Sequence, residues 1–384
     1  MPGAVRPGRQ ARGEMGKGKM QINGIDHVEL YVGDARQAAF YFGTAVGFRL
    51  CGQGGPETGL ADQRSLLLAQ ADIRMLLTSG LTAGHPASAY VQRHGDGIAV
   101  VALEVDDAAG AYAELVARGA TGVTPPRTHA DADAEVVVAE VGGFGDVLHR
   151  LVERRGDRSR FLPGAIEPLP AGAGDDVLAE IDHLAVCVPP GQLDDTVKHY
   201  AEVFGFAEIF EEHIEVAGQA MNSKVVQSPS QRVTLVLLEP DTGARPGQIE
   251  DFLRWHAGAG VQHLGLRTDD IVTAVGALAG RGVRFAGTPA AYYDDLEARV
   301  GKVDAPLDRL RDLSILVDSD HGGQLLQIFT ESMHVRRTLF LELIERRGAR
   351  TFGSGNIRAL YEAKERELAA AGATPAVAAG GVGA

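Results

Sequence analysis

An internal repeat constrains the fold of this 384-residue chain more than any other sequence feature. The segment GAGVQHLGLRTDD (258–270) matches GDGIAVVALEVDD (95–107), and EIDHLAVCV (180–188) matches GIDHVELYV (24–32). The paired segments share their glycines or their Ile-Asp-His, and all four have the apolar content of strands. We therefore expect two copies of one structural unit, one in each half of the chain.

The order of predicted elements is the same in both halves. After its first strand, each half continues with a helical stretch, ARQAAFYFGTAVGF or LDDTVKHYAEVFGF, which ends at a glycine. Alternating strands follow, and then the paired segments quoted above, each of which enters a helix at its Asp-Asp. A shared ERRG aligns the last strands, at 153–156 and 345–348. This order predicts an α+β fold in which each half forms a curved, mostly antiparallel sheet with helices outside.

The length of the chain suggests two domains. A stretch rich in Pro, Gly and Ala separates the halves, and both ends of the chain are rich in small or basic residues without an apolar face. We therefore predict a disordered leader, a first domain, a linker, a second domain and a disordered tail, at 1–22, 23–160, 161–176, 177–370 and 371–384.

Charge and composition exclude several kinds of binding partner. A formal net charge of −14 repels nucleic-acid phosphates and anionic lipid, so we expect neither nucleic acid nor a membrane as partner. No apolar run approaches the ~20 residues of a membrane span, and the start lacks the apolar core of a signal peptide. The two cysteines are too few for a disulfide framework. These features predict a cytoplasmic protein that binds a small molecule.

The two halves differ in residues that can bind a metal. In the repeat alignment His183 pairs with His27, His263 with Val100, and Glu342 with Arg150. Two imidazoles and one carboxylate on one face of a metal form the facial triad of non-haem Fe(II) oxygenases, whereas an arginine would repel the ion. We therefore predict an Fe(II) site in the second half and its loss from the first.

Each of these residues also has an ordinary structural interpretation. A single strand histidine is more often hydrogen-bonded and inert, and His27 is interpreted in that way. Glu342 shares its side of the strand with Phe340 and Ile344. If that side is buried, an unpaired carboxylate is costly, so a cation must lie nearby.

Longer motifs carry a family resemblance. GVQHLGL, GGQLLQIFT, FLELIERRG and FGSGNIRALYEA, with the spacing of the three predicted ligands, resemble the 4-hydroxyphenylpyruvate dioxygenases and the related 4-hydroxymandelate synthases, from about residue 24 to 367. The resemblance implies the vicinal-oxygen-chelate fold, which is glyoxalase/bleomycin-resistance-like. Its duplicated βαβββ modules would form two open-barrel domains, with Fe(II) in the C-terminal one and a C-terminal lid helix.

The resemblance also implies a reaction. The 2-oxo acid of an arylpyruvate would chelate Fe(II), and O2 would be consumed with loss of CO2. Dioxygenases then form homogentisate, whereas synthases hydroxylate the benzylic carbon to 4-hydroxymandelate, which supplies hydroxyphenylglycine for peptide antibiotics. AMNSKVVQS, SDHGGQLLQIF and SGNIRALYEA favour the synthase branch, as does isoleucine where dioxygenases carry phenylalanine in a GNF motif. Val236 departs from the threonine expected in synthases.

Carried over by position, nine residues would form the substrate site. Polar side chains would contact the substrate, and apolar ones would form the walls and lid: Ser223, Gln248, Gln327, Asn356, Val236, Phe340, Phe352, Ile357 and Tyr361. Gln248 could equally be a helix-capping residue. Family members are often oligomeric, so a homo-oligomer is possible.

Three other functions stay open. The nearest is the homogentisate-forming dioxygenase of tyrosine breakdown. A metal-free ligand-binding protein on the same scaffold is the second. A zinc isomerase or extradiol catechol dioxygenase is the third, and the C-terminal helix motif disfavours it.

Overall fold

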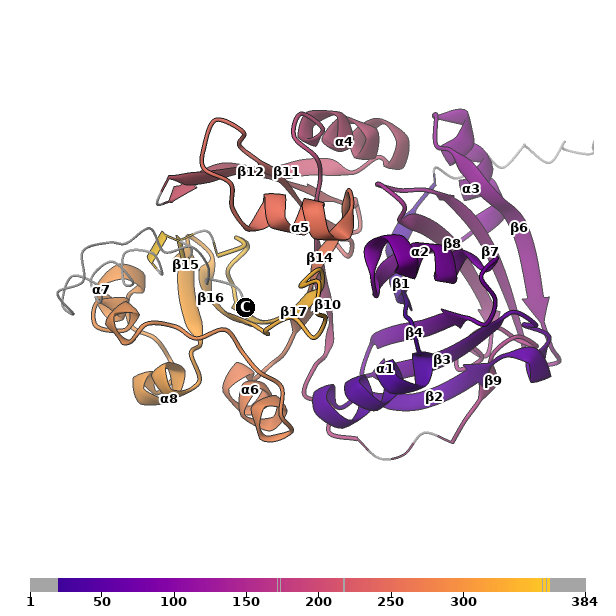
Figure 1. The fold of residues 1–384 in the computed structure, drawn as a ribbon, viewed down its shortest axis with the longest axis horizontal. Helices are drawn as coiled ribbons and strands as arrows, with labels where there is room; N and C mark the ends of the chain where they lie inside the picture. The colour runs from indigo at the N-terminus through magenta and orange to yellow at the C-terminus, as the bar shows by residue number, and fades with distance from the viewer. Residues whose placement is uncertain are drawn as a thin grey trace, which may run out of the picture.

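The computed structural model describes residues 20–170, 172, 174–216, 218–353, 355–356 and 358–359. Two curled sheets lie side by side, one from each half of the chain, with helices around them (Figure 1). Within the described residues the first sheet has nine strands in the order β6-β7-β8-β5-β1-β4-β3-β2-β9, and the second has eight in the order β11-β12-β13-β10-β14-β17-β16-β15. The predicted α+β architecture is confirmed.

The first half contains two βαβββ modules and an additional edge strand. Its elements are β1 (Ile22–Tyr31), α1 (Ala35–Tyr41), β2 (Arg49–Gly54), β3 (Gln63–Gln70), β4 (Ile73–Gly80), α2 (Pro86–His94), β5 (Gly97–Val105), α3 (Ala108–Ala117), β6 (Gly122–Ala130), β7 (Ala134–Gly142), β8 (Leu148–Gly156) and β9 (Glu167–Pro168).

The second half repeats the two modules and adds short helices before its last three strands. Its elements are β10 (Glu180–Cys187), α4 (Leu193–His199), β11 (Ala207–Val216), β12 (Gln219–Gln227), β13 (Thr234–Pro240), α5 (Gln248–His256), β14 (Gly260–Arg267), α6 (Ile271–Gly280), α7 (Leu296–Val300), α8 (Leu307–Asp312), β15 (Leu316–Asp320), β16 (Gly323–Phe329) and β17 (Phe340–Arg347).

Residues that recur in both halves begin and end the corresponding helices. α1 and α4 each continue into a π-helical turn that ends at a glycine, Gly47 or Gly205, in the left-handed conformation. Asp107 and Asp270 cap α3 and α6, because each side chain accepts a hydrogen bond from a main-chain N–H of the first turn. The Asp-Asp pairs thus begin helices at matching places in the two halves.

Strand register confirms the alignment of the two halves. β10 and β14 are antiparallel and β14 and β17 are parallel, which matches the pairing of β1, β5 and β8. Corresponding residues therefore stand in a row across three strands in each sheet: His183, Gly265 and Glu342 in one, His27, Ala102 and Arg150 in the other.

The segment predicted as a linker is partly folded. β9 pairs with β2 at the edge of the first sheet. Phe161 and Ile166 are buried against Leu67 and Leu76, so apolar side chains hold this stretch to the sheet. β1 also begins at Ile22, inside the predicted leader. Residues 1–19 and the tail 371–384 lie outside the described residues, and the domain boundaries 23–160 and 177–370 stay a prediction.

The two halves share one hydrophobic core. A single cluster of buried side chains includes residues of both sheets, and α2 and α5 meet across the boundary (Figure 1). A buried polar contact also crosses the boundary, because Tyr200 Oη lies 2.6 Å from His149 Nε2. Across the described residues no helix is long and apolar enough to cross a membrane.

Candidate iron site and substrate pocket

Three ligand atoms converge in the second half. His183, His263 and Glu342 lie on neighbouring strands β10, β14 and β17, and each offers one atom within 4.8 Å of the other two. His183 Nε2 lies 3.0 Å from Glu342 Oε2, and His263 Nε2 lies 3.6 Å from it. The predicted triad is therefore brought together, with both histidines turning the same ring nitrogen toward the carboxylate.

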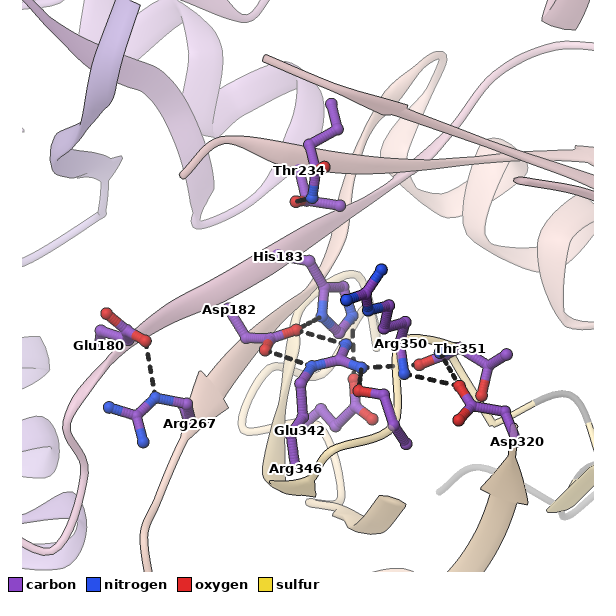
Figure 2. Close-up of polar contacts among 12 residues, drawn as sticks. Glu180, Asp182, His183, Thr234, Arg267, Asp320, Glu342, Arg346, Arg350 and Thr351 are labelled. Carbon is purple, nitrogen blue, oxygen red and sulfur yellow. Dashed lines mark hydrogen bonds and ion pairs between the residues drawn. The ribbon is translucent and has the colours of Figure 1, made fainter. Parts of the chain in front are cut away.

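Neighbouring side chains fix which nitrogen each ring presents. Asp182 Oδ1 lies 2.8 Å from His183 Nδ1, and Gln262 Oε1 lies 3.2 Å from His263 Nδ1. Figure 2 shows Asp182 between His183 and Arg346, whose guanidinium donates two hydrogen bonds to it at 2.6 and 2.8 Å. Such outer contacts orient ligands and leave Nε2 free for a metal.

The chain after β17 closes over this arrangement. Arg346 also donates to the carbonyl oxygen of Thr351 at 2.8 Å, and its guanidinium lies 5.0 Å from the centre of the Phe352 ring. Phe352 in turn packs edge-on against His183, with ring centres 5.5 Å apart. Arg346 therefore couples the position of a pocket wall to that of a predicted ligand.

A glycine makes room for His183. Gly265 is its partner on β14, and a Cβ at this position would lie 2.5 Å from Cε1 of the His183 ring. Any side chain at 265 would therefore displace the imidazole.

Electrostatics at the triad favour a bound cation. Burial lowers the pKa of His183, but Glu342 and Asp182 outweigh it and raise this pKa to about 9. Burial, followed by repulsion from His183, lowers the pKa of His263 well below its usual value. Burial opposes ionisation of Asp182 as well, yet hydrogen bonds from Arg346 and His183 hold the pKa of this carboxyl below its usual value. A proton on His183 thus neutralises Glu342 where a metal would.

The donor set fits Fe(II). Glu342 is only 2% exposed, and its ion partners within the described residues are the two histidines rather than a lysine or arginine. Two imidazole nitrogens and one carboxylate oxygen on one side of a pocket are the ligands of the non-haem Fe(II) facial triad. The cation predicted beside Glu342 is therefore the protonated His183 or a metal in its place.

The first half supplies its own cation instead. Arg150 Nη1 lies 2.7 Å from Glu29 and 3.3 Å from His27 Nε2, and Nη2 lies 2.8 Å from Glu140. His27 also contacts Asp26, at 2.6 Å, as the structural interpretation of this residue predicted. In the first half a guanidinium therefore contacts His27 and two carboxylates, at the register position that Glu342 holds in the second half.

The triad lines a pocket of the second half. Six of the predicted substrate residues line it: Ser223, Gln248, Gln327, Val236, Phe340 and Phe352. Phe340 stacks on His263 with ring centres 5.0 Å apart. Gln248 begins α5, but the N-cap residue is Gly247, so the capping alternative is wrong.

Asn356 does not line this pocket. Its Oδ1 accepts a hydrogen bond from the hydroxyl of Tyr292 at 2.6 Å, which turns the amide into the core. Ile357 and Tyr361 lie outside the described residues, as does most of the predicted lid helix.

The sequence interpretation missed several residues of the site. Asp182 and Gln262 each directly precede a predicted ligand, and the repeated Ile-Asp-His of β1 and β10 was a signal for the first. The pocket also includes Glu212 on β11 and Phe329 on β16. Phe329 stands in the motif GGQLLQIFT, which did not by itself place it in the pocket, whereas Glu212 stood in no quoted motif and its place depends on how the sheet curls.

Comparisons with known proteins define the class first. A sequence profile of the Glyoxalase/Bleomycin resistance protein/Dioxygenase superfamily matches residues 24–145 and 180–328, one match in each half. The duplicated fold and the His-His-Glu site therefore belong to a metal-dependent member of this superfamily.

Whole-chain relatives narrow the class to one family. 4-Hydroxyphenylpyruvate dioxygenases from Yarrowia lipolytica and Coccidioides posadasii are 34% and 36% identical, over 91% and 92% of this chain and 93% and 94% of theirs. A solved mutant of 4-hydroxymandelate synthase from Streptomyces coelicolor is 39% identical, with a TM-score of 0.81 over 91% of this chain and 99% of that one. The chain belongs to the 4-hydroxyphenylpyruvate dioxygenase and 4-hydroxymandelate synthase family, whose non-haem iron triad it carries.

Proposed function

We propose that this protein is an Fe(II)-dependent oxygenase that converts 4-hydroxyphenylpyruvate and O2 to 4-hydroxymandelate and CO2, with His183, His263 and Glu342 as iron ligands. The observation that carries the proposal is the triad, with His183 and Glu342 buried and His263 half-buried, among the residues that line an apolar pocket. In the cell this product would supply hydroxyphenylglycine for peptide antibiotics.

Different residues of the site have different roles in the proposed reaction. Bound Fe(II) supplies a Lewis-acidic centre that holds a 2-oxo acid and activates O2. Asp182 and Gln262 keep the two imidazoles in the orientation that binding requires. Phe329, Phe340 and Phe352 exclude water from the ring of the substrate, which protects the reaction from side products.

Polar groups would orient the substrate between these walls. Ser223, Gln248 and Gln327 line the pocket and offer hydroxyl and amide groups. Gln327 is 1% exposed and its Oε1 has no hydrogen-bond partner within the described residues, which fits a group kept for a ligand. Gln327 packs so closely on Gly353 that a Cβ there would lie 2.3 Å from its amide, so its place is fixed by the main chain.

The synthase branch is favoured by the pocket wall on β13. By resemblance, dioxygenases usually carry PINEP on this strand, where this chain reads VLLEP (236–240), so Leu238 stands in place of the asparagine. Leu238 lines the pocket and offers no amide to hold the aromatic ring in the position that the dioxygenases require. The solved relative with 39% identity also carries the name of the synthase.

Product identification tests the proposal. Purified protein would be incubated in air with 4-hydroxyphenylpyruvate, Fe(II) and ascorbate, and the products separated by chromatography. We expect 4-hydroxymandelate from the wild type, none from His263→Ala, and wild-type yield from His213→Ala, because His213 lies on β11 outside the pocket. Homogentisate as the sole product would overturn the synthase assignment.

Homogentisate formation is the second candidate. It is supported by the names of the curated relatives at 34% and 36% identity. A metal-free binding protein is the weaker alternative, because the chain carries the His-His-Glu triad. This alternative predicts that turnover is absent and that His263→Ala leaves ligand affinity unchanged.

A further inference from the structure

Strand β11 presents one acidic side chain to the substrate pocket and turns another away. Phe210, Glu212 and Ile214 line the pocket, as alternate residues of one strand do. Glu211 points to the other face, where its carboxylate lies 3.3 Å from Lys224 Nζ. The two adjacent glutamates therefore have different environments.

One oxygen of the half-buried Glu212 lacks the partner that a buried carboxylate oxygen normally has. Its Oε2 is buried and has no hydrogen-bond partner within the described part of the chain. No lysine or arginine is among the described residues that line the pocket. A buried acceptor without a donor is unfavourable, so its presence at a ligand pocket indicates that the donor comes with the ligand.

The neighbour of Glu212 suggests what kind of donor this is. Ser223 stands directly opposite it in the register of β11 and β12, and also lines the pocket. Opposite residues of antiparallel strands have Cβ atoms about 5 Å apart. A hydroxyl group of a ligand placed between them could donate to the carboxylate and accept from the serine hydroxyl.

The position of β11 determines which end of the substrate this pair can reach. β12 and β13 separate β11 from β10, which carries His183. Adjacent strands are about 4.8 Å apart, so Glu212 lies across the curled sheet from the metal ligands. A carboxylate there repels the 2-oxo acid end and accepts a hydrogen bond from the opposite end of an arylpyruvate.

We infer that Glu212 is a specificity-determining residue that accepts a hydrogen bond from the ring hydroxyl of a 4-hydroxyarylpyruvate. This inference rests on the proposed substrate class, but not on which product forms. It assigns two opposite preferences to one pocket: anionic oxygens at the metal end and a hydroxyl donor at the β11 end.

The test compares two substrates that differ only in this hydroxyl. Wild type, Glu212→Leu and Glu212→Gln would be assayed with 4-hydroxyphenylpyruvate and phenylpyruvate, with O2 uptake as a readout that does not depend on product identity. Glu211→Gln is the matched control, because its side chain points away from the pocket. Anaerobic calorimetry of the Fe(II)-loaded proteins gives Kd values for both compounds independently of turnover.

We expect Glu212→Leu to lower kcat/KM and affinity for 4-hydroxyphenylpyruvate by about 10- to 100-fold, the effect of one hydrogen bond to a charged acceptor. Phenylpyruvate should be nearly unaffected, and Glu212→Gln should be intermediate because its amide oxygen still accepts. Glu211→Gln should behave as wild type.

Two results would overturn the inference. Equal losses for both substrates would make Glu212 a structural residue, and no loss for either substrate would mean that the ring hydroxyl lies elsewhere. If wild type formed homogentisate, the proposed function would fail while the substrate comparison stayed valid. If wild type bound neither compound, both proposals would fail together.

Discussion

Arg150 offers the sharpest test of how the first half holds its fold without a metal. Its guanidinium contacts Glu29 at 2.7 Å and Glu140 at 2.8 and 2.9 Å. The side chains of Arg150, Glu29 and Glu140 are 13%, 4% and 16% exposed. Arg150→Met would therefore leave two carboxylates in a poorly hydrated site with no cation between them.

The expected loss of stability is large because Arg150→Met leaves Glu29 and Glu140 without their cation. Removing one partner of a buried ion pair costs about 3–5 kcal/mol, whereas replacing the whole group by neutral side chains is often neutral. We therefore expect Arg150→Met to lower the free energy of unfolding by about 3–5 kcal/mol. The triple variant Arg150→Met/Glu29→Gln/Glu140→Gln should recover most of that loss.

Urea unfolding followed by circular dichroism measures both values. Arg158→Met is the control, since its pair with Glu104 at 2.8 Å is 54% exposed on the arginine side and should contribute less than about 1 kcal/mol. Iron affinity should be unchanged throughout. A loss below about 1 kcal/mol for Arg150→Met, or a triple variant less stable than the single one, would refute this account of the first half.

Three further predictions concern protons and ligand orientation. Burial lowers the pKa of His149 to about 4, so below the unfolded-state value of 6.5 only the unfolded chain gains this proton. Stability should therefore fall from pH 6.5 toward pH 4 by up to about 3 kcal/mol, and less in His149→Asn, as urea titrations at several pH values would measure. Asp182→Asn should weaken iron binding about 10- to 100-fold in a chelator competition, whereas Asp26→Asn, at the matching place in the first half, should not. The raised pKa of His183 means that iron must displace a proton when it binds. The affinity for Fe(II) should therefore rise about tenfold per pH unit up to about pH 9, and an affinity independent of pH would contradict this.

The sequence could predict the triad because strand register carries over between copies. His263 against Val100 and Glu342 against Arg150 are differences at fixed positions of a repeated sheet, so aligning the copies was enough to find them. The six pocket residues that the structure brings together came instead from motif resemblance.

What the sequence could not predict depends on contacts distant along the chain. No residue near Asn356 in the sequence indicates that the hydroxyl of Tyr292 donates a hydrogen bond to its amide oxygen. The composition of 161–176 likewise does not indicate that Phe161 packs on the first sheet. Strand alternation predicts that Glu211 and Glu212 face opposite ways, but which of them faces the pocket depends on how the sheet curls.

The guanidinium at Arg150 makes the two halves respond differently to their surroundings. Its charge is tethered to the chain and cannot be removed by a chelator, oxidised or exchanged for another ion. The other half depends on a counter-ion that must be taken up from solution. When the metal is scarce, the reaction should therefore stop while the first half stays folded and charge-balanced. The metal site of the second half could then bind iron again without refolding of the first half.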